Sequence, residues 1–222
     1  YNAVFLVTLL MAIIGGRVLP MFTANGTMTP KVQPIVWLDR IALGSLWLIF
    51  AVHFLNLHTI LPSQVMVFLF TVSAVATAIR VARWKIWMTW RVPLLWSLHL
   101  AYWFIPVGLA LFALRYAGFE LTQSLALHAL TAGAMGNMIL SMIARVSLGH
   151  SGRPLQPKLI MTGAFLLVLI AALTRVFLMW LAPELTSQWL MFSTLAWALA
   201  YGIYVVVYFK VLTTPRADGN PG

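Results

Sequence analysis

Histidine and arginine side chains fall within segments of this sequence that are otherwise strongly apolar. His53, His99, His128 and Arg175 each lie inside a long apolar run. Ionisable groups are costly inside a membrane, so each is a functional candidate. A neutral imidazole is a ligand for haem iron and for copper, and a guanidinium forms two-pronged contacts with carboxylates such as haem propionates. These residue types therefore point to metal or haem chemistry.

The composition indicates an integral membrane protein. Hydrophobic residues make up 62% of the 222 residues and charged residues 8%, against roughly 25% charged residues in globular domains. The net charge of +10 would suggest nucleic acid in a soluble domain, but here it is attributed to basic membrane loops. The expected partner is therefore the lipid bilayer and not nucleic acid. The chain has no cysteine, which excludes disulfides and cysteine-bound clusters.

Seven apolar runs have about the length of 20 residues that a membrane-spanning helix needs. They cover residues 1–22, 39–58, 62–81, 93–114, 122–144, 159–181 and 188–209. The predicted fold class is all-α, a polytopic membrane helix bundle with about seven transmembrane helices. Residues 1–212 are expected to form one bundle, the C-terminal part of a longer membrane domain. The polar segment 213–222, rich in Pro and Gly, is predicted to be a disordered tail.

Basic residues are distributed unevenly between the loops. Twelve of the fourteen flank the loops after the first, third, fifth and seventh runs, whereas Arg115 lies at an alternate loop and Arg175 lies inside the sixth run. Basic loops usually remain in the cytoplasm. The N-terminus of this chain is therefore predicted to lie outside and the C-terminus in the cytoplasm.

All four acidic residues lie at the edges of the apolar runs or in the tail. They are Asp39, Glu120, Glu184 and Asp218. Ion pumps and proton-coupled transporters often use carboxylates deep in the membrane, and carboxylate di-iron sites need several inward-facing Glu residues. This segment supports neither class, although preceding spans could supply such residues.

Three of the buried ionisable residues are predicted to lie at one depth. From a rise of about 1.5 Å per residue, His53 is roughly 7 Å from the outer end of its run, and His128 and Arg175 are roughly 9 Å from theirs. Two histidines at matched depth could ligate one haem from both sides, with Arg175 near a propionate. His99 lies about 11 Å from the level of His128.

Two other interpretations of these residues stay open. Copper is the alternative metal, and His53 and His58 could contribute to an outer metal site if the helix end bends. A lone histidine in a span is often only hydrogen-bonded to a neighbouring helix, and Arg175 could extend its charge to the interface.

The fifth run carries a stripe of histidine and methionine beside small residues. At 100° per residue, His128, Thr131 and Met135 fall within about 60° of one another, and Gly133 and Gly136 form an adjacent face that permits close packing. This arrangement suits a helix against a flat macrocycle, with Met135 in contact. The alternative is ordinary packing, because methionine fills gaps in many cores.

The segment that follows, LGHSGRPLQPK, is basic and rich in turn residues. It is interpreted mainly as a structured loop that closes the inner face. Binding of an anionic lipid headgroup or a phosphate is the alternative.

The run from His128 to Pro154 reads H-x-x-T-x-G-x-M-G-x-M-I-L-x-M-I-x-R-V-x-L-G-H-x-G-R-P. This pattern closely resembles the signature of the NnrS family. GGRVLPMFT, residues 15–23, resembles that family's glycine–arginine segment, and PLLWSLHLAYWFIPVGL, residues 93–109, resembles its histidine-bearing span. The likeness covers most of the chain.

The resemblance implies a polytopic bacterial inner-membrane protein that takes part in the response to nitric oxide and contains haem and copper. Haem b is then the expected cofactor, copper a second one, and nitric oxide a candidate small-molecule partner. The resemblance also implies further N-terminal spans of the same protein. Its pattern carries over to His99, His128, Arg145, His150 and Arg153, and to Arg17 in the glycine segment. A transporter and an assembly factor, both without metal, are the competing interpretations.

Overall fold

The computed structural model describes residues 1–219, and all regular structure in that range is helical. Helices account for 81% of the residues, and seven of them are long and apolar enough to cross a membrane. The predicted fold class, an all-α membrane bundle with seven spans, is therefore confirmed.

The first four spans are single helices, and the next two contain π-helical segments. The single helices are α1 (Asn2–Thr27), α2 (Val36–Phe54), α3 (Ser63–Ala82) and α4 (Pro93–Tyr116). The fifth span joins α5 (Gln123–His128), η3 (Ala129–Gly136) and α6 (Asn137–His150), and the sixth joins α7 (Leu159–Leu173), η4 (Thr174–Leu178) and α8 (Met179–Leu181). The seventh is α9 (Thr186–Thr213), and short 3₁₀ turns are η1 (Leu57–Thr59), η2 (Ile86–Met88) and η5 (Pro183–Leu185).

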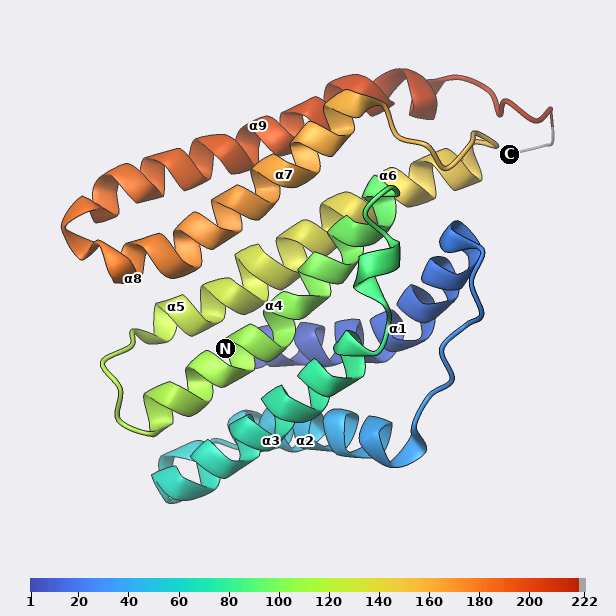
Figure 1. Cartoon of the computed structure of the whole chain (residues 1–222). Helices are drawn as coiled ribbons and strands as arrows, with labels where there is room; N and C mark the ends of the chain where they lie inside the picture. The colour runs from blue at the N-terminus through green and yellow to red at the C-terminus, as the bar shows by residue number, and fades with distance from the viewer. Residues whose placement is uncertain (220–222) are drawn as a thin grey trace.

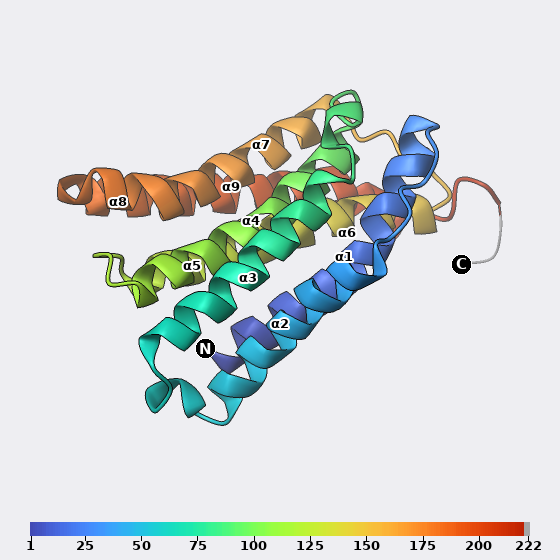
Figure 2. The same cartoon turned by 60° about the horizontal axis from the view of Figure 1, so that its bottom comes forward.

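Helix α4 lies at the centre of the bundle (Figures 1 and 2). It packs against α1, α3, α6, α7 and the α5–η3 segment, and it is the most buried span. Helices α2 and α3 lie side by side at one edge, and α7 pairs with α9 at the other. Side chains of α9 such as Val206 and Phe209 are exposed. Such apolar exposure suits contact with lipid.

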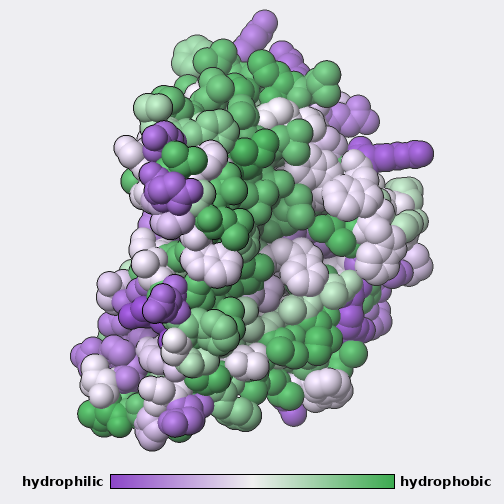
Figure 3. Space-filling model, turned by 60° about the vertical axis from the view of Figure 1, so that its left-hand side comes forward, coloured by the Kyte–Doolittle hydropathy of each residue, from purple (hydrophilic) through white to green (hydrophobic). Residues whose placement is uncertain are grey.

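The molecular surface has the polarity expected of a membrane bundle. Apolar and aromatic side chains cover most of the face drawn in Figure 3, and hydrophilic side chains gather along its two sides.

Helix α1 is longer than the sequence suggests. Its run was predicted to end at residue 22, but the helix continues through Pro20 to Thr27 and stops where Met28 adopts a left-handed conformation. The added turn is held by the core, because Thr23 is buried and hydrogen-bonds to His99 of α4. Arg17 consequently lies within the helix and not at the loop that follows it.

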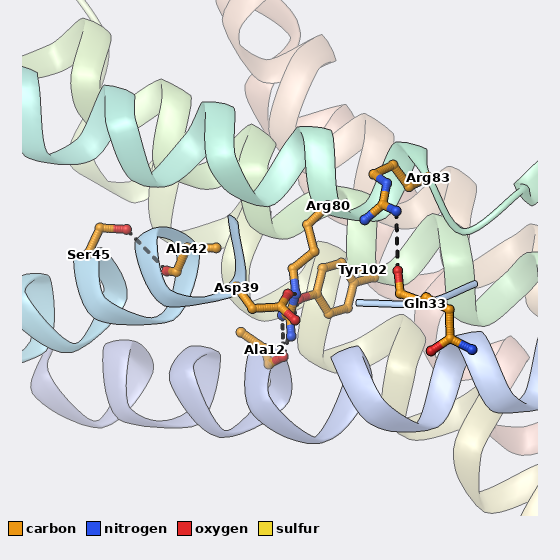
Figure 4. Close-up of polar contacts among 8 residues, drawn as sticks. All are labelled: Ala12, Gln33, Asp39, Ala42, Ser45, Arg80, Arg83 and Tyr102. Atoms are coloured by element: carbon orange, nitrogen blue, oxygen red, sulfur yellow. Dashed lines mark hydrogen bonds and ion pairs between the residues drawn. The ribbon is translucent and has the colours of Figure 1, made fainter. Parts of the chain in front are cut away.

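A buried arginine on α3 joins four helices (Figure 4). Arg80 donates from Nε to Asp39 Oδ1 at 2.6 Å, and from Nη1 to the Ala12 carbonyl oxygen at 2.8 Å and to the Tyr102 hydroxyl at 2.9 Å. A methyl group at Gly16 would overlap the guanidinium, so this glycine leaves the space for it. The sequence places Arg80 among the basic residues of the loop after the third run. The structure corrects this prediction, because the Arg80 side chain points into the bundle.

The predicted tail runs along the loop that follows α6. The backbone N–H of Ala217 donates to the Ser151 carbonyl at 2.9 Å, and Arg216 pairs with Asp218 at 2.6 Å. Residues 220–222 of the predicted 213–222 tail lie outside the described residues. Disorder of the tail therefore stays a prediction.

Replacing Arg80 by leucine should destabilise the bundle by about 3 kcal/mol, because it leaves the Asp39 carboxylate without its cation and the Ala12 carbonyl without this donor. Arg83→Leu is the matched control. Arg83 lies one turn away on the surface and donates only to the Gln33 carbonyl at 3.2 Å, so its loss should cost less than about 1 kcal/mol. Reversible unfolding in detergent would measure both, and equal losses would contradict the proposed role of the network.

Candidate functional site

A cleft between α5, η3, η4, α8 and α9 contains the main cluster of predicted site residues. It consists of two adjoining hollows of about 710 and 650 Å³, and His128 and Arg175 line both. Met135 lines the second hollow. The structure thus brings three of the candidate residues together from two different spans. We call this region the His128 cleft.

The His128 imidazole is oriented by its own helix. Its Nδ1 lies 2.6 Å from the Ser124 carbonyl oxygen and 3.2 Å from the Ser124 hydroxyl. A carbonyl can only accept a hydrogen bond, so Nδ1 carries the proton and Nε2 keeps its lone pair. Histidines that bind metals are commonly held this way, with the second nitrogen donating to a carbonyl.

Two ionisable residues that line the cleft, His128 and Arg175, lie at π-helical segments, and the third, Glu120, lies in the loop before α5. His128 immediately precedes η3, and Arg175 lies within η4. A π-helical turn is wider than an α-helical one and is found frequently at functional sites. Two independent spans therefore depart from regular α-helix at the cleft that their ionisable residues line.

Two side chains donate hydrogen bonds to backbone carbonyls within η3. Asn137 is buried and donates from Nδ2 to the carbonyls of Ala132 and Gly133 at 3.1 and 2.8 Å. From α9, the Tyr201 hydroxyl donates to the Gly136 carbonyl at 2.7 Å. These hydrogen bonds satisfy polar groups in an apolar setting and hold the irregular backbone in place.

Helix α9 forms the aromatic wall of the cleft. Trp197 and Tyr201 line the second hollow and stack with ring centroids 4.1 Å apart. Gly136 faces them closely, since a Cβ there would lie 3.2 Å from the Trp197 indole nitrogen. Ser193, on the same helix, donates to the Ala171 carbonyl at 3.0 Å, just before η4. Helix α9 is therefore hydrogen-bonded to both spans that contain π-helical segments.

His53 lies in a different part of the molecule. Its Nδ1 contacts the Ile49 carbonyl at 2.8 Å, and its ring packs 4.5 Å from that of Phe5. The chain turns back after α2 through Asn56, which has a left-handed conformation, and this places His58 parallel to His53 at 4.7 Å. The two histidines share a separate hollow of about 450 Å³. His53 and His128 therefore line different cavities.

His99 is enclosed in the core between α4, α1 and Trp84. The Thr23 hydroxyl donates to the Leu19 carbonyl at 2.8 Å, so it accepts from His99 Nε2, also at 2.8 Å. The Trp84 ring meets the imidazole edge-on at 6.3 Å. His99 Nδ1 is buried and has no hydrogen-bond partner within the described chain.

The remaining candidates are spread over α1 and the basic end of the bundle. Arg17 is exposed on α1, and His150 is exposed at the end of α6. Arg145 is buried with its guanidinium carbon 3.8 Å from the centroid of the Phe22 ring. Arg153 donates to Thr214 Oγ1 at 2.7 Å beyond the end of α9. None of these four side chains lines the His128 cleft.

The His128 cleft fits a haem in size and in the groups it offers. Each hollow is within the range of about 300–1,000 Å³ typical of small-molecule sites. A haem needs only axial ligands from the protein, because the porphyrin supplies the other nitrogens, and Nε2 of His128 is free to act as one. Arg175 forms no ion pair with any described residue, so it can pair with a propionate. Among residues 1–219 no group of three His, Cys, Asp or Glu side chains is arranged to hold a bare metal ion.

Three features of the site were not predicted from the sequence. Asn137, Trp197 and Tyr201 were not singled out, and neither π-helical segment was foreseen. An asparagine inside an apolar run was an available signal for Asn137. The Trp197–Tyr201 pair, four residues apart on the last span, resembled ordinary interfacial aromatics.

Comparison with known proteins identifies one family. A family model described as NnrS protein matches residues 1–216. No curated protein and no solved structure gives a significant match.

Asn137→Leu should destabilise the protein by about 1–3 kcal/mol, because two buried carbonyls lose a donor. Ser141→Ala is the control one turn further along α6. The Ser141 hydroxyl is buried without a hydrogen-bond partner, so its removal should leave stability unchanged or slightly raised. Unfolding in detergent would compare the two variants, and equal stability would show that Asn137 does not support the π-helical turn.

Proposed function

The chain belongs to the NnrS family, and we propose that it is a haem-binding, multi-pass protein of the bacterial inner membrane with His128 as a ligand to the iron. Membership of this family fits a membrane protein of the nitric oxide response. In this proposal the basic loops and the C-terminus face the cytoplasm.

One observation carries the proposal. His128 and Arg175 come from different spans, lie at π-helical segments and line the same cleft. π-helical turns are rare, and they occur frequently at functional sites. Distortion in two spans at one cleft supports a binding site there.

Five residues of the cleft have proposed roles. His128 is held through its Nδ1–H, so Nε2 is the ligand atom. Arg175 binds a propionate, and Met135, Trp197 and Tyr201 form the wall against the porphyrin. When bound, haem supplies an iron centre that takes nitric oxide as a ligand.

The earlier pairing of His53 with His128 on one iron is not retained in this proposal. The two side chains line separate cavities, so His128 is assigned as the ligand from this chain. No second ligand is assigned from these seven spans, and haem, if bound, would supply an iron centre for nitric oxide.

Copper has a separate candidate place in the His53–His58 hollow. Both rings line it together with Tyr116. The rings are stacked with an interplanar angle of 12°, and ring nitrogens direct their lone pairs within the ring plane, so one ring must turn before both bind one ion. Metal analysis of His58→Ala beside the wild type would test this second site, with unchanged copper content as the contrary result.

The haem proposal is tested by absorption spectra of the purified protein, oxidised and dithionite-reduced, with and without nitric oxide. The wild type should show a Soret band that shifts with nitric oxide. His128→Ala should lose it, whereas His53→Ala and the control His150→Ala, at the exposed end of α6, should keep it. Arg175→Gln should lower haem affinity by about tenfold, because it removes a charge-assisted contact.

The contrary outcomes lead to different conclusions. Haem retained by His128→Ala but lost by His53→Ala or His99→Ala would move the ligand to that residue. A wild type without haem, despite adequate haem supply, would remove the haem interpretation. A transporter or an assembly factor without metal would then remain.

A further inference from the structure

Another pocket lies at the basic end of the bundle, between the loop after α6 and the end of α9. It has a volume of about 400 Å³, and its lining includes Arg153, Lys158, Lys210 and Tyr208. No acidic residue lines it. We call it the Tyr208 pocket.

The cations of the pocket differ in how firmly they are held. Arg153 is anchored, since it donates to Thr214 Oγ1 at 2.7 Å and to the Val211 carbonyl at 3.3 Å. Lys158 and Lys210 are exposed and form no ion pair with a described residue. One fixed and two adaptable positive charges therefore surround the pocket, and no carboxylate of its lining balances them.

The backbone adds further positive potential. Lys158 is the residue before the first turn of α7, and no side chain caps that helix. The first N–H groups of a helix have no partner within it, and they carry a partial positive charge. Helix N-termini with these properties bind phosphate groups.

The phenol of Tyr208 is the independent sign of a ligand. The side chain is 2% exposed, and it lines the pocket while its hydroxyl has no hydrogen-bond partner within residues 1–219. Its ring is held by stacking on Tyr204 at 4.7 Å. A buried hydroxyl without a partner is unfavourable. An acceptor oxygen in the pocket would satisfy it.

We propose that the Tyr208 pocket binds a phosphate-bearing anion, either the headgroup of an anionic phospholipid or free phosphate. The phosphate oxygens accept from the Tyr208 hydroxyl, and they pair with Arg153, Lys158 and Lys210. Basic pockets between membrane helices recognise lipid headgroups in this way. The pocket lies at the ends of α7 and α9, which places it at the level of headgroups.

The test uses the full chain in nanodiscs and in lipid-free detergent. The probes are phosphatidylglycerol, phosphatidylcholine and inorganic phosphate, and the readouts are retained lipid by native mass spectrometry and the melting temperature. The binding variants are Lys158→Ala/Lys210→Ala and Tyr208→Phe. Lys31→Ala/Arg91→Ala is the matched control, because it removes two exposed charges from the same end of the bundle but outside the pocket.

The wild type and the control are expected to retain phosphatidylglycerol in preference to phosphatidylcholine. The double lysine variant should bind phosphatidylglycerol roughly thirtyfold more weakly, because each cation near the membrane surface raises the affinity about fivefold. Tyr208→Phe should also bind more weakly, yet melt no lower than the wild type in lipid-free detergent, which separates binding from folding.

Inorganic phosphate distinguishes the two sources. If it stabilises the wild type but not the double lysine variant and displaces phosphatidylglycerol, free phosphate is the ligand. If it has no effect while the lipid preference depends on the lysines, the ligand is the lipid headgroup. Equal lipid retention by the wild type and the double lysine variant, with no effect of phosphate on either, would overturn the proposal.

Discussion

A guanidinium buried among four helices is the constraint on which the first half of the bundle depends. Arg80 satisfies Asp39, Tyr102 and the Ala12 carbonyl at once, and a charge inside an apolar bundle is tolerated only with such partners. The network fixes α1, α2 and α3 against the central helix α4. Gly16 is required at the closest approach, because any side chain there would occupy the position of the guanidinium.

With α4 held on one side, its other side supports the spans that form the His128 cleft. Gly133 permits this packing, since a Cβ there would lie 2.3 Å from Phe104 of α4. The cleft itself is formed where two spans leave the α-helical pattern and α9 supplies side chains to their carbonyls. Close packing against α4 holds the fifth span in place, and the irregular backbone of η3 and η4 borders the open cleft.

The sequence by itself was sufficient for the architecture. Long apolar runs separated by basic loops predict seven membrane helices, because no other open arrangement satisfies the backbone in lipid. The pattern from His128 to Pro154 was sufficient for the family. Depth along a helix follows from residue count, so the sequence predicts similar depths for His128 and Arg175.

Tertiary structure decided which side chains share a cavity. Residues with one predicted depth can lie in different cavities. His53 packs against His58 and Phe5, whereas His128 and Arg175 line the same cleft. Arg80 gives a second example. Its position near a helix end predicts a charge in the loop, but its side chain binds partners on three other helices. The depth of a residue in a membrane helix depends only on its position within that helix. The direction in which a side chain points within a bundle depends on the packing of all its helices, and on departures from α-helix such as η3 and η4 that single-residue periodicity does not reveal.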